Sequence, residues 1–388
     1  MDDILTPPER VADSLPRAPR KGVGLCLSGG GYRAMLFHVG ALWRLNELGW
    51  LPRLSFVSSV SGGSITAGVL AAKWRDLGFR DDGVAMNFAD QIAQPLRALA
   101  DHTIDIPSVL TGILTPRTTV GDRTTASLRH HLFGAATLAD LPDSPRFIFT
   151  ATNLHSGSLW RFSKPYMRDW QVGKVEKPKV PLAQAVAASA AFPPVLSPVT
   201  LEVDPASWDV VETKPRGDLD PWPPRKIKLS DGGVYDNLGL QPVLQRCATI
   251  LVSDGGGHMS YEARVASGWI RHLGRVLAVV DNQVRSLRKI RLIDEYERGT
   301  FDGAYWGIRG DISAYLREAK KPVTNALHAP FAATSKLAAI ATRLAAMNVP
   351  TQERLINWGY AICDVAVRGM VEETDRPPDF PYRCGVSA

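Results

Sequence analysis

Short apolar runs and helical spacings alternate along the first part of the chain. Residues Val23–Leu27 form an apolar run of strand length, and a second run covers about Leu54–Val60. Between them, four apolar residues recur at the spacing of one helix face: Met35, Val39, Leu42 and Leu45. This helix is expected to end at Gly49, and another to run from about Ser64 to Trp74. Strand, helix, strand and helix in this order predict a βαβ unit with parallel strands.

The same alternation continues towards the C-terminus. Further strands are predicted at Phe147–Thr152, Lys226–Leu229 and Ile250–Val252, whereas the Pro-, Asp- and Trp-rich residues 202–226 predict an irregular loop. A late amphipathic helix is marked by apolar positions at Leu337, Ile340, Leu344 and Met347. Thr351 is expected to cap one more helix. The pattern as a whole predicts an α/β fold.

The predicted elements belong to one domain. Residues 1–20, rich in Pro, Arg and Asp, are expected to form a flexible leader. No internal repeat or linker interrupts the remainder, which predicts a single domain over residues 21–388. Its motifs fall within residues 21–257, and the C-terminal strand and helices occupy residues 258–388.

Composition and charge narrow the class of protein. The chain is 45% hydrophobic and 22% charged, as in globular enzymes, and its net charge is +6. It has no dense Lys/Arg stripe with interleaved aromatic residues, so we expect no nucleic-acid partner. Four scattered cysteines indicate no metal site and favour a reducing cytoplasm. The first residues resemble no secretory signal, and no apolar run reaches the roughly 18 residues of a membrane span. We therefore expect a cytoplasmic protein that meets lipid from the water side.

A serine lies in the sequence context of a nucleophile. Ser61 follows the second predicted strand and precedes a helix, as in the tight turn that lifts a catalytic hydroxyl clear of a sheet. Such a turn needs small neighbours, which Ser59, Gly62 and Gly63 supply. The positive end of the following helix dipole would favour an oxyanion there. Ser61 is therefore the candidate nucleophile.

Three glycines end the first strand, about one βαβ turn before Ser61. Gly29, Gly30 and Gly31 are expected to emerge at the same sheet edge as Ser61, where their N–H groups would form an oxyanion hole. Arg33 adds a positive charge. Gly29, Gly31 and Ala34 also fit a dinucleotide-binding fingerprint, but serines stand where that fingerprint needs an acidic residue. The serines therefore favour an oxyanion loop over a dinucleotide-binding loop at these glycines.

The nucleophile needs a proton acceptor. Asp231 follows a short predicted strand, and Gly232 and Gly233 after it allow the chain to turn, so its carboxylate is the candidate base. Asp254 precedes Gly255–Gly257 in a similar context and is expected to belong to a strand-to-helix turn instead. Among the eight histidines, His258 has the best context for a Ser-His-Asp triad, which remains an alternative.

These blocks resemble the patatin-like phospholipases. The resemblance rests on Ser28–Ala34, on Ser61–Gly63, on Asp231–Gly233 with the following Asn237, and on the Ala-Ser segment at residues 187–194. The first block is also similar to the glycine loop of cytosolic phospholipases A2. The resemblance implies a three-layer α/β/α fold with a mainly parallel central sheet, and a Ser61–Asp231 dyad without a catalytic histidine. It also implies an oxyanion role for Gly30, Gly31 and Arg33.

The implied activity is hydrolysis of acyl esters of membrane lipids, of the phospholipase A type, through an acyl-enzyme. No cofactor and no metal are implied, and contact with membranes would be peripheral. The alternatives are a general carboxylesterase and an effector silent until an activator binds, either a small molecule such as a cyclic dinucleotide or a protein. Residues 274–388 lie beyond the motif blocks and would hold such a regulatory site.

Three further features have structural interpretations. His38, behind the glycine loop, is expected to be a packed histidine with satisfied hydrogen bonds. The apolar residues between positions 104 and 114 indicate either a lipid-facing lid or buried core. A late basic run is expected to form a solvated helix face; it comprises Arg285, Arg288, Lys289 and Arg291.

Overall fold

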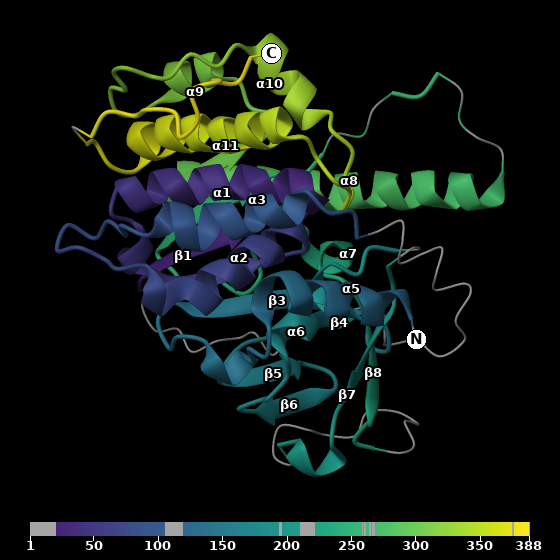
Figure 1. Ribbon diagram of the computed structural model, residues 1–388. Coiled ribbons are helices and arrows are strands. Elements are labelled where there is room, and N and C mark those ends of the chain that lie inside the picture. The colour runs from purple at the N-terminus through teal and green to yellow at the C-terminus, as the bar shows by residue number, and fades with distance from the viewer. Residues whose placement is uncertain are drawn as a thin grey trace.

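Five parallel strands form the centre of the sheet, in the order β10–β9–β1–β2–β3 (Figure 1). Their bounds are Val23–Leu27 (β1), Leu54–Ser59 (β2), Arg146–Asn153 (β3), Thr249–Asp254 (β9) and Asp302–Gly307 (β10). The predicted βαβ unit is confirmed, because β1 and β2 are hydrogen-bonded parallel neighbours.

The structure is a computed structural model. It describes residues 21–104, 119–193, 196–209, 222–257, 259, 261–263, 265, 268–374 and 376–387, with the backbone alone at 269–271. The expected leader, most of the apolar 104–114 segment and His258 lie outside the described residues.

Antiparallel strands extend the sheet beyond β3. One edge of β3 pairs with β4, which leads to β5 and β6, and β8 pairs with the other edge beyond β2 and carries β7. Their bounds are Ser158–Phe162 (β4), Tyr166–Asp169 (β5), Gly173–Glu176 (β6), Val199–Glu202 (β7) and Lys226–Asp231 (β8). The sequence predicted β8 but not its antiparallel direction.

Helices cover both faces of the sheet. Their bounds are Gly31–Glu47 (α1), Gly62–Lys73 (α2), Gln94–Ala100 (α3), Val120–Leu128 (α5), Leu182–Ser189 (α6), Gly233–Asp236 (α7), Trp269–Glu297 (α8), Ile312–Glu318 (α9), Phe331–Ala338 (α10) and Val349–Met370 (α11). Alternate residues of β1 show the two faces: Leu25 belongs to the main core with α1 and α11, whereas Cys26 packs in a smaller cluster with Leu238 and Leu292 of α8. The predicted three-layer α/β/α fold is confirmed.

The first and last long helices cross closely. Helix α11 lies over α1 (Figure 1), and two glycines meet at the crossing. A Cβ atom on Gly40 would lie 1.8 Å from the carbonyl oxygen of Ile356, and one on Gly359 would lie 1.9 Å from that of Phe37. Only glycine fits at such distances, so the sequence itself fixes how closely these helices approach.

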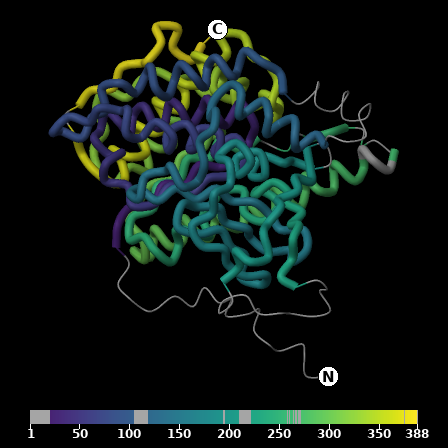
Figure 2. The backbone as a smooth tube through the Cα atoms, turned by 60° about the horizontal axis from the view of Figure 1, so that its bottom comes forward, coloured from purple at the N-terminus to yellow at the C-terminus, as the bar shows by residue number. Residues whose placement is uncertain are grey.

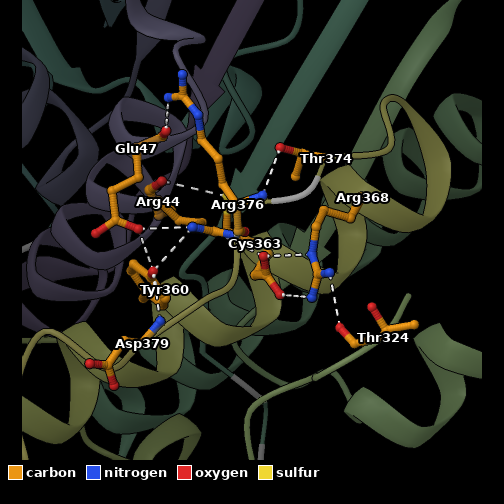
Figure 3. Close-up of polar contacts among 11 residues, drawn as sticks. Arg44, Glu47, Thr324, Tyr360, Cys363, Arg368, Thr374, Arg376 and Asp379 are labelled. Carbon is orange, nitrogen blue, oxygen red and sulfur yellow. Dashed lines mark hydrogen bonds and ion pairs between the residues drawn. The ribbon is translucent and has the colours of Figure 1, made fainter. Parts of the chain in front are cut away.

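A buried ion network ties the same two helices together (Figure 3). Asp364 of α11 accepts hydrogen bonds from Arg44 of α1, at 2.8 Å, and from Arg368, at 2.8 and 2.7 Å. Arg44 also donates to Glu47 at 2.9 Å and to the carbonyl of Arg376, in the C-terminal tail, at 2.6 Å. The network therefore joins the N-terminal helix, the C-terminal helix and the tail.

Helix α8 departs from this arrangement because it extends beyond the body of the protein. Figures 1 and 2 show its N-terminal half projecting outward, while its C-terminal half contacts α7 and β10. No helix among the described residues is long and apolar enough to cross a membrane.

Candidate active site

Ser61 occupies a strained turn between β2 and α2. Its backbone φ is 51°, a conformation that residues other than glycine adopt at a cost of roughly 1–3 kcal/mol and that clusters at functional sites. The flanking glycines are required by close contacts. A Cβ atom on Gly62 would lie 2.1 Å from the carbonyl oxygen of Gly31, and one on Gly63 would lie 2.4 Å from that of Leu27. The turn at Ser61 and the glycine loop are therefore in contact, as the spacing between the two motifs predicts.

A chain of hydroxyl groups holds this turn. The Ser61 N–H donates to Oγ of Ser189, at the end of α6, at 3.0 Å. Ser189 Oγ lies 2.8 Å from Ser64 Oγ, which in turn donates to Ser59 Oγ at 3.0 Å. Ser59 thus places a hydrogen-bonding side chain two residues before the nucleophile, where a glycine is usual in such turns. The sequence singled out the Ala-Ser segment but assigned no role to Ser189.

Strand pairing brings Asp231 to the level of Ser61. Ser59 of β2 is paired with Phe149 of β3, and two residues further along β3, Ala151 is paired with Asp231 of β8. Ser61 lies two residues beyond Ser59, so both candidate residues reach the same level of the sheet. Because β8 runs antiparallel to β3, Asp231 arrives there from the opposite direction.

The Asp231 carboxyl group is buried, and only one of its oxygens is tied down. Oδ1 accepts a hydrogen bond from the Gly233 N–H at 2.7 Å. Oδ2 is buried and accepts no hydrogen bond from the described residues. Burial raises the pKa of Asp231 to about 7, against the opposing effects of the Gly233 N–H and the nearby Ser61 hydroxyl. A carboxyl group with this pKa can exchange a proton near neutral pH.

Two of the three loop glycines have free N–H groups. The sequence predicted Gly29, Gly30 and Gly31 together as donors. The Gly29 N–H instead donates to the carbonyl and side-chain oxygens of Asn237, at 3.1 and 3.2 Å. Within the described part of the chain, the N–H groups of Gly30 and Gly31 have no acceptor. Positive φ values of 146° and 61° at these two positions explain why they are glycines.

Arg33 is buried beneath the loop. Its guanidinium donates to the Gly255 carbonyl at 3.2 and 3.1 Å and also to the carbonyl of Ile340. Burial lowers its pKa to about 10, so it stays charged at neutral pH. The sequence predicted Arg33 as part of the oxyanion hole; in the structure its donors hold neighbouring backbone segments against the loop.

Two helices begin at the site. Gly30 is the N-cap residue of α1 and Ser61 that of α2, and neither helix has a side-chain cap. The N-terminal end of each helix carries a partial positive charge. A Cβ atom on Gly29 would lie 3.2 Å from Cβ of Ser61, which places the two ends side by side. This arrangement favours negative charge on a bound group.

Asn237 connects the end of β8 and the segment that follows it, residues 231–237 including α7 (the base loop), to the glycine loop. Its side-chain oxygen accepts from Gly29, and its side-chain NH₂ group lies 3.5 Å from Asp281 of α8. Asp281 lies near enough to Asp231 to contribute to its raised pKa. Helix α8 is therefore part of the wall of the site, a role that no sequence motif indicated.

Asp254 has a structural role. Tyr305 donates to its Oδ2 at 2.7 Å, and the Gly256 N–H donates to Oδ1 at 2.8 Å. Although burial acts to raise it, the pKa of Asp254 is lowered by nearby Arg285 and by these hydrogen bonds. Both oxygens are thus engaged, unlike those of Asp231. The predicted tight strand-to-helix turn at Gly255–Gly257 is wrong, because β9 ends at Asp254 and the next described helix, α8, begins only at Trp269.

Arg285 corrects one prediction. The basic run was expected to be a solvated helix face, but the side chain of Arg285 is buried and donates to the Gly257 carbonyl at 2.6 Å. Arg288 donates to the carbonyl of Tyr235, in the base loop, at 3.0 Å. The prediction failed because positive charge on a helix says nothing about the carbonyl groups packed against it.

The described histidines offer no partner for Ser61. His38 is fully buried: its Nε2–H donates to the Ser28 carbonyl at 2.9 Å, and Nδ1 accepts from Ser253 at 2.8 Å. Burial lowers the pKa of His38 to about 4, so it is neutral, as its predicted packed role requires. His155 is exposed on a turn. Among the residues described, no group of three or more His, Cys, Asp or Glu side chains is arranged to hold a metal ion.

Comparison with known proteins places these features in a family. The sequence profile described as "Patatin-like phospholipase" matches residues 25–244. A search of curated protein sequences finds no match. Human GIVD cytosolic phospholipase A2 is similar in structure with a TM-score of 0.48 at 14% identity, over 89% of this chain and 61% of that one. VipD from Legionella pneumophila has a TM-score of 0.33 at 16% identity, over 89% and 66%. This chain thus spans about three fifths of the human enzyme's length.

Proposed function

The chain belongs to the patatin-like phospholipase family, and on that premise we propose that it is a serine lipid acyl hydrolase. It would cleave acyl esters of membrane lipids through a Ser61–Asp231 dyad. The observation that carries the proposal is the state of Asp231: a buried carboxyl group with one oxygen uncommitted and the Ser61 hydroxyl beside it.

In the proposed reaction, Asp231 accepts the hydroxyl proton while Ser61 Oγ attacks the ester carbonyl carbon. The carbonyl oxygen becomes an oxyanion, which the N–H groups of Gly30 and Gly31 and the two helix N-termini stabilise. Collapse of the intermediate breaks the ester bond, and Asp231 returns the proton to the departing alcohol. This leaves an acyl-enzyme on Ser61.

The second half of the reaction reverses these roles. Asp231 takes a proton from water, which attacks the acyl-enzyme and releases the fatty acid, and the proton returns to Ser61. Ser189 supports both halves by fixing the backbone at Ser61, and Arg33 by holding neighbouring segments against the glycine loop. No step of the proposed reaction uses a metal or a cofactor.

The test measures fatty-acid release from mixed phospholipid vesicles by the wild type, Ser61→Ala and Asp231→Ala, with a chelator present. We expect each substitution to lower release at least about a thousandfold. His155→Ala is the matched control and should keep full activity, because that side chain is exposed on a turn.

Labelling with a fluorophosphonate separates a wrong choice of lipid from a wrong nucleophile. A fluorophosphonate phosphonylates an activated serine whatever lipid the enzyme prefers. The wild type should be labelled, and Ser61→Ala should not. Equal labelling of both proteins would place the nucleophile elsewhere, and hydrolysis of soluble esters without vesicle lipids would favour a general carboxylesterase.

A further inference from the structure

The outer half of α8 exposes aliphatic side chains to solvent. Five of them are between 41% and 53% exposed: Leu273, Val276, Leu277, Val279 and Val280. At 100° per residue they span roughly 160° of the helix circumference, which is the width of an apolar face that is normally buried. In Figures 1 and 2 this part of the helix stands clear of the body of the protein.

The charge of this region is positive. From position 258 to position 280 the sequence contains three arginines and a single acidic residue, Glu262. Arg275 pairs with Glu262 at 3.1 Å, so the net positive charge of the stretch comes from Arg264 and Arg271 in the sequence. The chain as a whole has a net charge of +6. An exposed apolar helix face within a stretch of net positive sequence charge is complementary to an anionic lipid surface.

The inner half of the same helix is attached to the candidate site. Asp281 approaches Asn237, Arg285 donates to the Gly257 carbonyl, and Arg288 donates to the carbonyl of Tyr235. The exposed face thus begins at Val280, directly beside Asp281, which lies in the wall of the site. Whatever covers this face is therefore bound to a helix that contacts the candidate site.

Other exposed apolar side chains lie on loops of the same site. Phe192 is 54% exposed and follows Ala191, whose carbonyl accepts from the Asp231 N–H at 2.9 Å. Val234, in the base loop, is 50% exposed. Val234 lies in α7, which packs against α8. A lipid surface that covers the outer half of α8 would also be the source of substrate, which a protein partner would not be.

We propose that residues 272–280 of α8 lie in the interface of an anionic membrane, with the aliphatic face in the acyl region, and hold the site at the lipid surface. The proposal rests on the proposed function for its purpose, but the binding it describes can be measured separately from catalysis.

The binding test uses the full chain carrying Ser61→Ala, so that hydrolysis cannot alter the vesicles. Co-sedimentation with vesicles of phosphatidylcholine and phosphatidylglycerol is compared with and without Leu277→Gln/Val280→Gln. We expect at least about a tenfold loss of binding, because two aliphatic contacts with the acyl region are removed. Met86→Gln/Val349→Gln is the matched control: these side chains are 68% and 49% exposed elsewhere, and binding should not change.

Two outcomes would contradict this proposal, and a third measurement tests the proposed function separately. Unchanged binding after Leu277→Gln/Val280→Gln would overturn the proposal. A dimer in sedimentation velocity that these substitutions convert to a monomer, with vesicle binding intact, would assign the face to a second copy instead. Hydrolysis of a soluble short-chain ester should be the same in both proteins when Ser61 is present. Its absence from the wild type would contradict the proposed function and leave the binding result standing.

Discussion

Asp231 combines burial with an uncommitted oxygen, and this combination sets its chemistry. A buried carboxylate normally has its oxygens paired or its proton bound. Here the Gly233 N–H satisfies Oδ1, while Oδ2 is buried without a hydrogen-bond partner among the described residues. Burial raises the pKa of Asp231 to about 7, more than the Gly233 and Ser61 interactions lower it. The group is therefore partly protonated at neutral pH, which has consequences for both rate and stability.

The rate should follow the ionisation of Asp231. Only the carboxylate form can accept the Ser61 proton, so kcat/KM for a soluble ester should rise as the pH increases from 5 to 8. The half-maximal value is expected near pH 7, where the pKa of Asp231 lies. Measuring kcat/KM for hydrolysis of an uncharged soluble ester at a series of pH values from 5 to 8 tests this directly. A flat profile over this range would contradict the assignment of Asp231 as the base.

The stability should respond in the opposite direction. Because the pKa of Asp231 is higher in the folded chain than in the unfolded chain, the folded state holds its proton more tightly. The stabilisation is fully present below the unfolded pKa of about 4 and is lost as the pH rises through about 7. Asp231→Asn mimics the protonated form and should be more stable than the wild type at pH 8, by roughly 2 to 4 kcal/mol. Urea unfolding at pH 4 and pH 8 tests this, and the difference should vanish at the lower pH.

At the scale of elements, the sequence predicted the parts that depend on local pattern. The strand at Val23–Leu27 was predicted with its observed bounds, and those of β2, β3 and β9 within one or two residues, because apolar runs between turn residues are local signals. The contact between the Gly31 loop and the Gly62 turn followed from βαβ geometry. The dyad and oxyanion roles of these residues stay predictions.

Several elements outside the parallel core were missed or misplaced. Strands β4 to β6 follow β3 as hairpins with only four or five residues per strand, too short for their alternation to stand out in the sequence, and β7 pairs with β8 across residues 203–225. Helix α10 ends at Ala338, before the predicted apolar positions at Ile340, Leu344 and Met347. The cap of α11 is Asn348, whose side chain accepts from the Thr351 N–H, so the predicted cap was three residues too late. The basic run from Arg285 to Arg291 was predicted to lie on a helix, but the extension of α8 back to Trp269 was not predicted.

The pairing of α1 with α11 depends on one buried carboxylate. Asp364 is fully buried between Arg44 and Arg368 (Figure 3). Asp364→Asn would leave the buried Arg368 without its counter-charge and Arg44 with Glu47 alone, and breaking a buried ion pair typically costs about 3–5 kcal/mol. The exposed pair of Arg53 and Glu372 provides the matched control, because Glu372→Gln should cost less than about 1 kcal/mol. Thermal unfolding of the two variants should therefore differ clearly. Equal midpoints would mean that the network contributes little.

At the scale of the whole molecule, the fold extends beyond the segment that matches the family. That match ends at residue 244, yet β9 and β10 complete the parallel sheet, and α11 covers α1. The Arg33 guanidinium also donates to the carbonyl of Ile340. These contacts support our proposal that residues 21–388 form one domain. The C-terminal third would then be part of the site's scaffold and not a separable regulatory unit.

A truncation tests this unity. A chain ending at Gly257 keeps every motif block and the whole family match, but it loses β10 and α11. Removing them would expose the edge of β9 and the apolar face of α1 that Ile356 and Cys363 now cover, so we expect aggregation on expression. Co-expression of residues 258–388 as a second chain is the control, because the same surfaces would be covered without a covalent link. Soluble protein with a cooperative unfolding transition from residues 1–257 alone would show that two units exist. Rescue by the second chain would show that the C-terminal third completes the hydrolase core.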